Sequence, residues 1–98
     1  MLALLDLLGR RWALRILWEL RQAPATYQAL QQRCDSMSTS VLSQRLTELR
    51  DAQLVEKDAE GAYALTEPGM RLLARLDGMD EWTREWSGLL RGGTRERA

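Results

Sequence analysis

The chain has 98 residues, which is enough for one domain with one modest hydrophobic core. Its 14 basic and 14 acidic residues give a net charge of zero, which mildly disfavours nucleic-acid binding because phosphates favour a basic surface. The absence of histidine removes most metal sites and the commonest general base, and the single cysteine, Cys34, fits a reducing cytoplasm. We therefore expect a cytoplasmic protein without a metal, a cofactor or a membrane span.

The first third of the chain predicts three helices. A short apolar stripe ends before Gly9, and a second stripe follows and ends before Pro24. The members of the two stripes share helical spacing: Leu2, Leu5 and Leu8, then Trp12, Ile16, Leu17 and Leu20. Thr26 can cap a third helix, which carries Tyr27, Leu30 and Cys34 on one face.

A turn over residues 35–37 leads to the helix that we expect to matter most, which Ser38 can cap and which extends to about Ala52. At 100° per residue, one narrow arc is apolar and must face the core: Leu42, Leu46 and Leu49. The opposite side is polar, and Ser43 and Glu48 flank it: Ser40, Gln44, Thr47 and Asp51. Short hydroxyls and amides are partners for base edges and phosphates, although a solvated polar face is the simpler interpretation.

Two short segments, residues 54–58 and 62–66, predict strands joined by the three-residue loop 59–61. The loop ends in Gly61, which suits the left-handed conformation of such a turn. Together these signals predict a β-hairpin after the polar helix.

The last predicted element is one long helix, capped by Thr66, with Pro68 in its first turn and its end at Arg91. Its apolar stripe is too long for one small core to cover: Met70, Leu73, Leu76, Met79, Trp82, Trp86 and Leu90. A homodimer would cover its distal half, because the first helix exposes a matching stripe. The expected interface comprises Leu2, Leu5, Leu8, Met79, Trp82, Trp86 and Leu90. We expect residues 1–91 to form one domain and residues 92–98 to form a flexible tail.

This order of elements predicts a mainly α protein with a small β-hairpin, in the winged helix-turn-helix arrangement with terminal helices for dimerisation. In such a fold the second helix of the pair, here residues 38–52, enters the major groove.

Several segments resemble HxlR-type regulators, which are relatives of the MarR group. The segments are Leu5–Trp12, Ile16–Leu20, Val41–Leu49, Leu54–Glu56, Tyr63–Gly69 and Glu81–Trp82. The resemblance implies a homodimeric, DNA-binding transcriptional regulator, by analogy a repressor, and it favours the DNA interpretation of the polar face. This chain departs from the family in its short acidic wing, in Thr39, Ser40 and Thr47 at positions that are often basic, and in Gln53 where glycine is usual.

The expected DNA contacts are Ser38, Thr39, Ser40, Ser43, Gln44, Arg45 and Thr47. Gln44 can bond an adenine edge, and the first turn can hold a phosphate while Ser38 caps it. Arg45 lies at the edge of the apolar arc, where it can reach a phosphate or pair with Glu48 or Asp51; the pattern does not choose between them. The roles of Arg10 and Arg11 are equally open.

Other interpretations compete with this one. Cys34 and the four tryptophans suit packing better than redox sensing or an effector pocket, and no effector is identifiable. The neutral charge and acidic wing also fit a winged-helix interaction module that has lost DNA binding. An enzyme is disfavoured, since the sequence shows no phosphate-binding glycine loop and no nucleophile–base pair.

Overall fold

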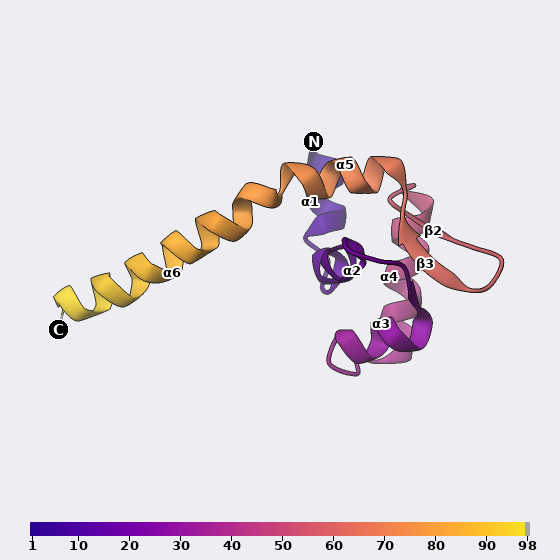
Figure 1. Cartoon of the computed structure of the whole chain (residues 1–98), viewed down its shortest axis with the longest axis horizontal. Coiled ribbons are helices and arrows are strands. Elements are labelled where there is room, and N and C mark those ends of the chain that lie inside the picture. Colours follow the sequence, from indigo (N-terminus) through magenta and orange to yellow (C-terminus); the bar gives the residue numbers. More distant parts are fainter. Residues whose placement is uncertain (98) are drawn as a thin grey trace.

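The computed structural model describes the backbone of residues 1–97 and the side-chain surroundings of residues 1–91. The elements in chain order are α1 (Leu2–Leu8), α2 (Ala13–Leu20), β1 (Ala25–Thr26), α3 (Tyr27–Arg33), α4 (Thr39–Asp51), β2 (Val55–Lys57), β3 (Ala62–Leu65), α5 (Glu67–Arg75) and α6 (Asp77–Arg97). Helices α2 to α5 surround the core beside a small sheet, and α6 extends away from this body (Figure 1). The winged helix-turn-helix prediction is confirmed.

Three helices begin at the residues that the sequence predicts as caps. The hydroxyl of Thr26 accepts a hydrogen bond from the amide of Ala29 at 3.2 Å, and that of Ser38 accepts from Val41 at 3.2 Å. The hydroxyl of Thr66 accepts from the amide of Gly69 at 3.1 Å. Each cap satisfies a backbone donor that the first helical turn leaves unpaired, which is worth about 1 kcal/mol.

The core lies where the apolar stripes of α2, α3 and α4 meet. Its largest fully buried side chains are Ile16, Leu17, Leu30, Cys34, Leu42, Leu46 and Leu49. The predicted core face of α4 is therefore confirmed, and so is the packing of Cys34 as a small buried side chain.

The sheet has three antiparallel strands in the order β1-β3-β2, with Val55 opposite Leu65 and Ala25 opposite Tyr63. The hairpin is confirmed, and Gly61 has the expected left-handed conformation, with φ of 89°. The loop is closed by Asp58, whose carboxylate accepts hydrogen bonds from the backbone amides of Glu60 and Ala62, each at 2.9 Å. The sequence did not predict β1, because two residues carry no periodicity and the strand forms only by pairing with distant β3.

The prediction of one long last helix is wrong, because the helix is interrupted at Leu76, between α5 and α6. There the amide of Leu76 donates to the carbonyl of Leu73 at 3.0 Å, and that of Met79 donates to Leu76 at 2.9 Å. These three-residue bonds tighten the turn. Asp77 and Gly78 favour a break, since both are weak helix formers and an acid suits the first turn of a new helix. Helix α6 also extends past Gly92 and Gly93, the predicted end.

Helix α5 packs against α2 and β3, whereas α6 leaves the body and brings the extents of the molecule to 55 × 28 × 24 Å. The side chains of residues 92–98 lie outside the described part of the chain, so the flexible tail stays a prediction.

Candidate nucleic-acid interface

Helix α4 presents one continuous polar face to solvent. Its exposed residues are Thr39, Ser40, Ser43, Gln44, Thr47, Arg50 and Asp51. The capping residue Ser38 is also exposed and extends this face at the helix N-terminus. The structure thus brings six of the seven predicted DNA-contacting residues to one surface.

The hydroxyls on this face differ in how far they are already engaged. The Tyr27 hydroxyl, from α3, lies 2.9 Å from the Ser43 hydroxyl and donates to the carbonyl of Thr39 at 2.8 Å. The Thr47 hydroxyl donates to the carbonyl of Ser43 at 2.9 Å, and the hydroxyls of Ser38 and Ser40 lie 3.3 Å apart. These contacts fix the face against α3, and the hydroxyls retain acceptor capacity toward an outside partner.

Gln44 is the free polar group at the centre of the face. The residue is exposed, and its carboxamide makes no hydrogen bond to any residue that the structure describes. A free carboxamide carries both donors and acceptors, which is the combination that an adenine edge requires.

Arg45 does not belong to the outward face. Its Nη1 lies 2.8 Å from a carboxylate oxygen of Glu48, and its Nε donates to the carbonyl of Arg11 at 2.8 Å. The side chain is only 16% exposed. Of the alternatives that the sequence left open, the structure shows pairing with Glu48 and not with Asp51. Because Nε and Nη1 are engaged within the chain, Arg45 is set apart from the exposed polar face, and its DNA contact stays a prediction.

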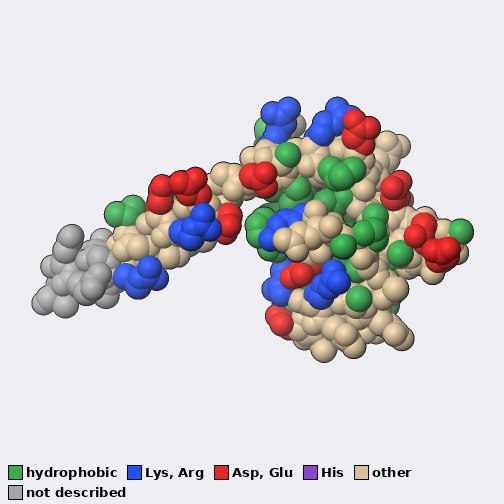
Figure 2. Space-filling model, in the orientation of Figure 1, with side chains coloured by type: hydrophobic (Ala, Val, Ile, Leu, Met, Phe, Trp, Pro, Cys, Tyr) green, Lys and Arg blue, Asp and Glu red, His purple; other side chains and the backbone are tan. Residues whose placement is uncertain are grey.

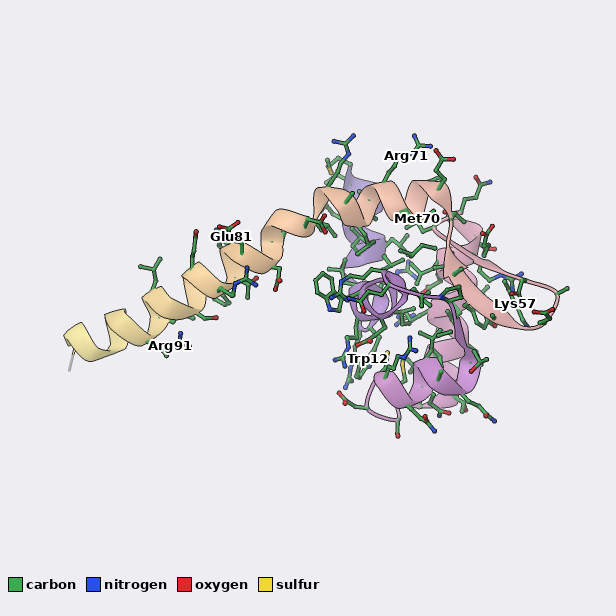
Figure 3. The ribbon with its side chains drawn as sticks, viewed as in Figure 1. Trp12, Lys57, Met70, Arg71, Glu81 and Arg91 are labelled. Atoms are coloured by element: carbon green, nitrogen blue, oxygen red, sulfur yellow. The ribbon has the colours of Figure 1, made fainter. Side chains whose placement is uncertain are left out.

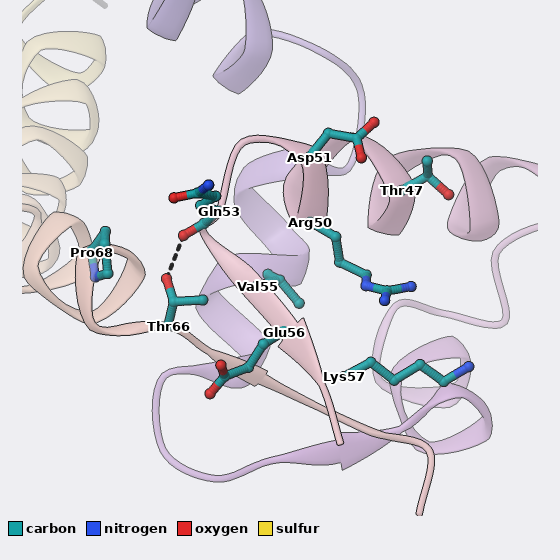
Figure 4. Close-up of a pocket in the computed structure, with 9 residues that line it drawn as sticks. All are labelled: Thr47, Arg50, Asp51, Gln53, Val55, Glu56, Lys57, Thr66 and Pro68. Atoms are coloured by element: carbon teal, nitrogen blue, oxygen red, sulfur yellow. Dashed lines mark hydrogen bonds between the residues drawn. The ribbon is translucent and has the colours of Figure 1, made fainter. Parts of the chain in front are cut away.

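The sequence analysis missed two basic residues, Arg50 at the C-terminal end of the face and Lys57 beside it on β2. Arg50 and Lys57 line an open groove of about 570 Å³ between the end of α4, the strand β2 and the start of α5. Both side chains project to the same side, whereas Glu56 projects to the other side of β2 (Figure 4). Arg50 makes no ion pair among the described residues, and the Lys57 ammonium lies 5.5 Å from the Tyr63 ring centroid. The signal in the sequence that could have revealed this groove was Arg50, a basic residue one helical turn after Thr47.

The wing, which is the hairpin of β2 and β3, differs in charge between its base and its tip. Lys57 lies on the wing (Figure 3), whereas acidic side chains gather over the hairpin loop (Figure 2). Asp58 and Glu60 are both exposed there. The tip would repel a phosphate, whereas the base would attract one.

Most other arginines of the body are engaged. Arg10 pairs with Asp6 and Glu48. The hydrogen bond to Asp6, and after it the charge of Glu48, raise the pKa of the Arg10 guanidinium. Arg15 lies 2.9 Å from Glu19, and hydrogen bonding to that acid raises the pKa of Arg15. Arg10 is thus committed to carboxylates, whereas Arg11 lies over the ring of Trp12, with its guanidinium carbon 5.9 Å from the ring centroid.

The second candidate surface is apolar and follows α1 and α6. Trp82 and Trp86 are 55% and 46% exposed, and Leu2, Leu5, Met79 and Leu90 are also exposed on these two helices. At its root, a groove of about 340 Å³ opens between α1, α2 and the α5–α6 junction. Its lining is mainly apolar: Leu8, Leu14, Arg15, Trp18, Leu73, Leu76 and Met79. Leu8, Trp12 and Trp18 are partly buried against the core.

Two further findings concern sites that are absent from the described residues. No helix among them is long and apolar enough to cross a membrane. No group of three or more cysteine and acidic side chains within that part of the chain could hold a metal ion.

Known proteins resemble this chain over most of its length. The HxlR-like helix-turn-helix family matches residues 7–90. The HTH-type transcriptional regulator YodB of Bacillus subtilis is 30% identical over 83 residues, which are 79% of this chain and 74% of that protein. The crystal structure of quinone-bound YodB superposes with a TM-score of 0.79 at 30% identity, over 87% of this chain and 94% of that one. An HxlR family transcriptional factor of Thermoplasma volcanium superposes with a TM-score of 0.73 at 26% identity, over 85% and 80% of the two chains.

Proposed function

Because the chain belongs to the HxlR-like helix-turn-helix family, whose members are transcriptional regulators rather than enzymes, we propose that it binds double-stranded DNA as a homodimer. Helix α4 reads the major groove of one half-site per subunit. The observation that carries this proposal is the exposed polar face of α4, with the free carboxamide of Gln44 at its centre.

The contacts divide by chemistry. Gln44 reads a base edge, because it projects from the middle of the face and its carboxamide has no hydrogen-bond partner among the described residues. Thr39 and Ser40, at the capped N-terminus of α4, hold a backbone phosphate with Ser38, since amides and hydroxyls converge there. Ser43 and Thr47 line the groove-facing side between these groups.

A second phosphate contact lies at the other end of α4. Arg50 and Lys57 project side by side from the groove between α4 and the base of the wing. Both are cations without a carboxylate partner among the described residues, so they can exchange solvent for phosphate at little cost. The acidic wing tip stays away from the DNA backbone.

The homodimer is proposed from the exposed apolar surface of α1 and α6. Soluble monomers seldom expose a contiguous apolar surface of this kind. A two-fold axis would bring each α6 against the partner's apolar surface and cover both tryptophan pairs. Two copies of α4 would then address half-sites about 34–36 Å apart, or a multiple of this spacing.

Repression is the proposed direction of regulation, by analogy with the family and not from a feature of the site. Binding to chromosomal DNA also implies a cytoplasmic location.

A binding assay tests the proposal. The protein is titrated into a labelled random duplex at low salt, and the titration is repeated as the salt concentration rises. We expect binding whose affinity falls linearly on a log–log scale, as counterion release requires. Selection from a random DNA pool should then yield a site with two-fold symmetry. No binding to any duplex at low salt would favour the alternative of an interaction module, which the neutral net charge supports.

A further inference from the structure

One carboxylate of α4 binds two arginines that come from different parts of the chain. Glu48 accepts hydrogen bonds from Arg10 and from Arg45, the latter at 2.8 Å. Arg10 lies in the connection between α1 and α2, 38 residues away in sequence from Glu48. Its second guanidinium nitrogen lies 3.2 Å from Asp6 on α1. A chain of ion pairs therefore runs from α1 through Arg10 to α4.

A second contact holds the same connection against α4. The Nε of Arg45 donates to the backbone carbonyl of Arg11 at 2.8 Å. The next residue, Trp12, has a φ of 75°, which is a costly conformation for a bulky side chain. Trp12 packs against the core. Such a conformation persists only where its surroundings hold it, and here α4 supplies part of those surroundings.

Burial distinguishes the Arg45–Glu48 pair within this network from the other ion pairs of the described residues, whereas Arg10 is 43% exposed. The side chains of Glu48 and Arg45 are 19% and 16% exposed, whereas those of the Glu67–Arg71 pair are 75% and 67% exposed. An exposed pair contributes little to structure, because water and salt screen it. A half-buried carboxylate that binds two arginines is a stronger geometric constraint.

We propose that Glu48 is a positioning residue that couples α1, part of the proposed dimer surface, to the orientation of α4. The inference rests on the proposed function, because the coupling matters when two copies of α4 must match two half-sites. Glu48 and Arg45 lie on the flank of α4 that faces the α1–α2 connection, and they touch no DNA. They hold the helix at a fixed rotation relative to the surface through which the two subunits meet.

The first experiment measures specific and random DNA affinity for Arg10→Gln and Glu48→Gln. Arg71→Gln is the matched control, because it breaks an ion pair on α5. The Arg71 side chain points away from the body (Figure 3). We expect Arg10→Gln and Glu48→Gln each to lower the ratio of specific to random DNA affinity about tenfold. Mutations along a coupling network produce effects of this size. Sedimentation should show the same dimer as the wild type, and Arg10→Lys should restore most of the ratio.

The salt dependence identifies a direct phosphate contact. If Arg10 itself binds DNA, Arg10→Gln will weaken specific and random binding equally and lower the salt slope by about 1. That result would overturn the proposal, and so would an unchanged ratio in a folded Glu48→Gln protein. Should Glu48→Gln fail to fold, Arg10→Gln decides alone, since it leaves the Arg45–Glu48 pair in place.

A second experiment does not depend on DNA, so it separates failure of this inference from failure of the proposed function. Spin labels are placed at Ala3→Cys on α1 and Gln44→Cys on α4, in a Cys34→Ala background diluted with unlabelled protein. Pulsed distance measurements should give one narrow distribution that broadens in Arg10→Gln and not in Arg71→Gln. Equal widths in all three proteins would overturn the coupling, whether or not the protein binds DNA.

Discussion

Trp82 and Trp86 stack on each other along the exposed side of α6, with their ring centroids 5.6 Å apart and their planes inclined by 15°. Both rings remain about half exposed in the single chain. Two stacked indoles at the surface of a helix that leaves the body are an unusual exposure of apolar area, and they suit the centre of an interface.

We expect Trp86→Ala to give a monomer or an insoluble protein with weak operator binding. Truncated tryptophans at interface centres commonly cost about 2 kcal/mol or more. Sedimentation across a micromolar concentration range measures the loss. Arg84→Ala is the control, because Arg84 pairs with Asp80 at 2.9 Å on the other side of α6. A wild-type protein that sediments as a monomer at micromolar concentration would contradict the dimer and the half-site geometry.

Gln44→Ala tests base readout. The variant should lose about 1–3 kcal/mol on the selected site and little on random duplex, because a bidentate amide contact discriminates between bases. Fluorescence anisotropy with both duplexes gives the two affinities. Gln32→Ala, an exposed glutamine on α3, should change neither. Equal losses on both duplexes for Gln44→Ala would leave only a backbone contact.

Arg50→Gln should weaken binding to specific and random duplexes alike and reduce the salt slope by about 1, since one phosphate contact is removed. Lys57→Gln should do the same. Arg71→Gln, in an exposed pair with Glu67, removes an equal charge elsewhere and corrects for the change in net charge. An unchanged slope in both groove variants would place the groove between α4 and the wing outside the DNA interface.

Glu60→Lys tests whether the wing tip stays off the DNA. A lysine there should bring the tip toward a phosphate, so binding should tighten mainly at low salt and the salt slope should steepen. The salt series used for Arg50→Gln measures both effects. If deletion of the tip residues 59–60 from the otherwise wild-type protein abolished DNA binding, the wing would be a main DNA contact.

Cys34 is buried, and burial raises the pKa of its thiol, although the charge of Arg15 partly opposes this. A maleimide should therefore label native protein slowly and unfolded protein fast. Because the folded state holds the proton more tightly, its contribution to stability is complete below the unfolded pKa of about 8.5 and is lost as the pH rises above it. The free energy of unfolding should fall more steeply over that range in the wild type than in Cys34→Ala. Fast labelling coupled to release from DNA would instead indicate a redox role.

The sequence by itself determined the local features of this protein. Thr26, Ser38 and Thr66 cap their helices because each cap is a bond to an amide three residues on. Gly61 adopts the left-handed conformation that its hairpin loop requires. Gln53 is also left-handed, with φ of 62°, at the position where the HxlR-type regulators usually have glycine. The inward leucines and outward Gln44 of α4 follow from helical period alone.

Only the tertiary structure decided which distant groups meet. Residue pattern left Arg45 a choice of partners, and the packing of α4 against the α1–α2 connection selected Glu48 and the carbonyl of Arg11. Arg50 and Lys57 come together because β2 folds back along α4, and β1 exists only through its pairing with β3. Helix α5 packs against α2 and β3 while α6 leads away from the body, and the unbroken spacing of the apolar stripe did not reveal the break at Leu76 between them. Local bonds can be predicted from spacing, whereas these contacts depend on how close the folded chain brings segments that are far apart in sequence.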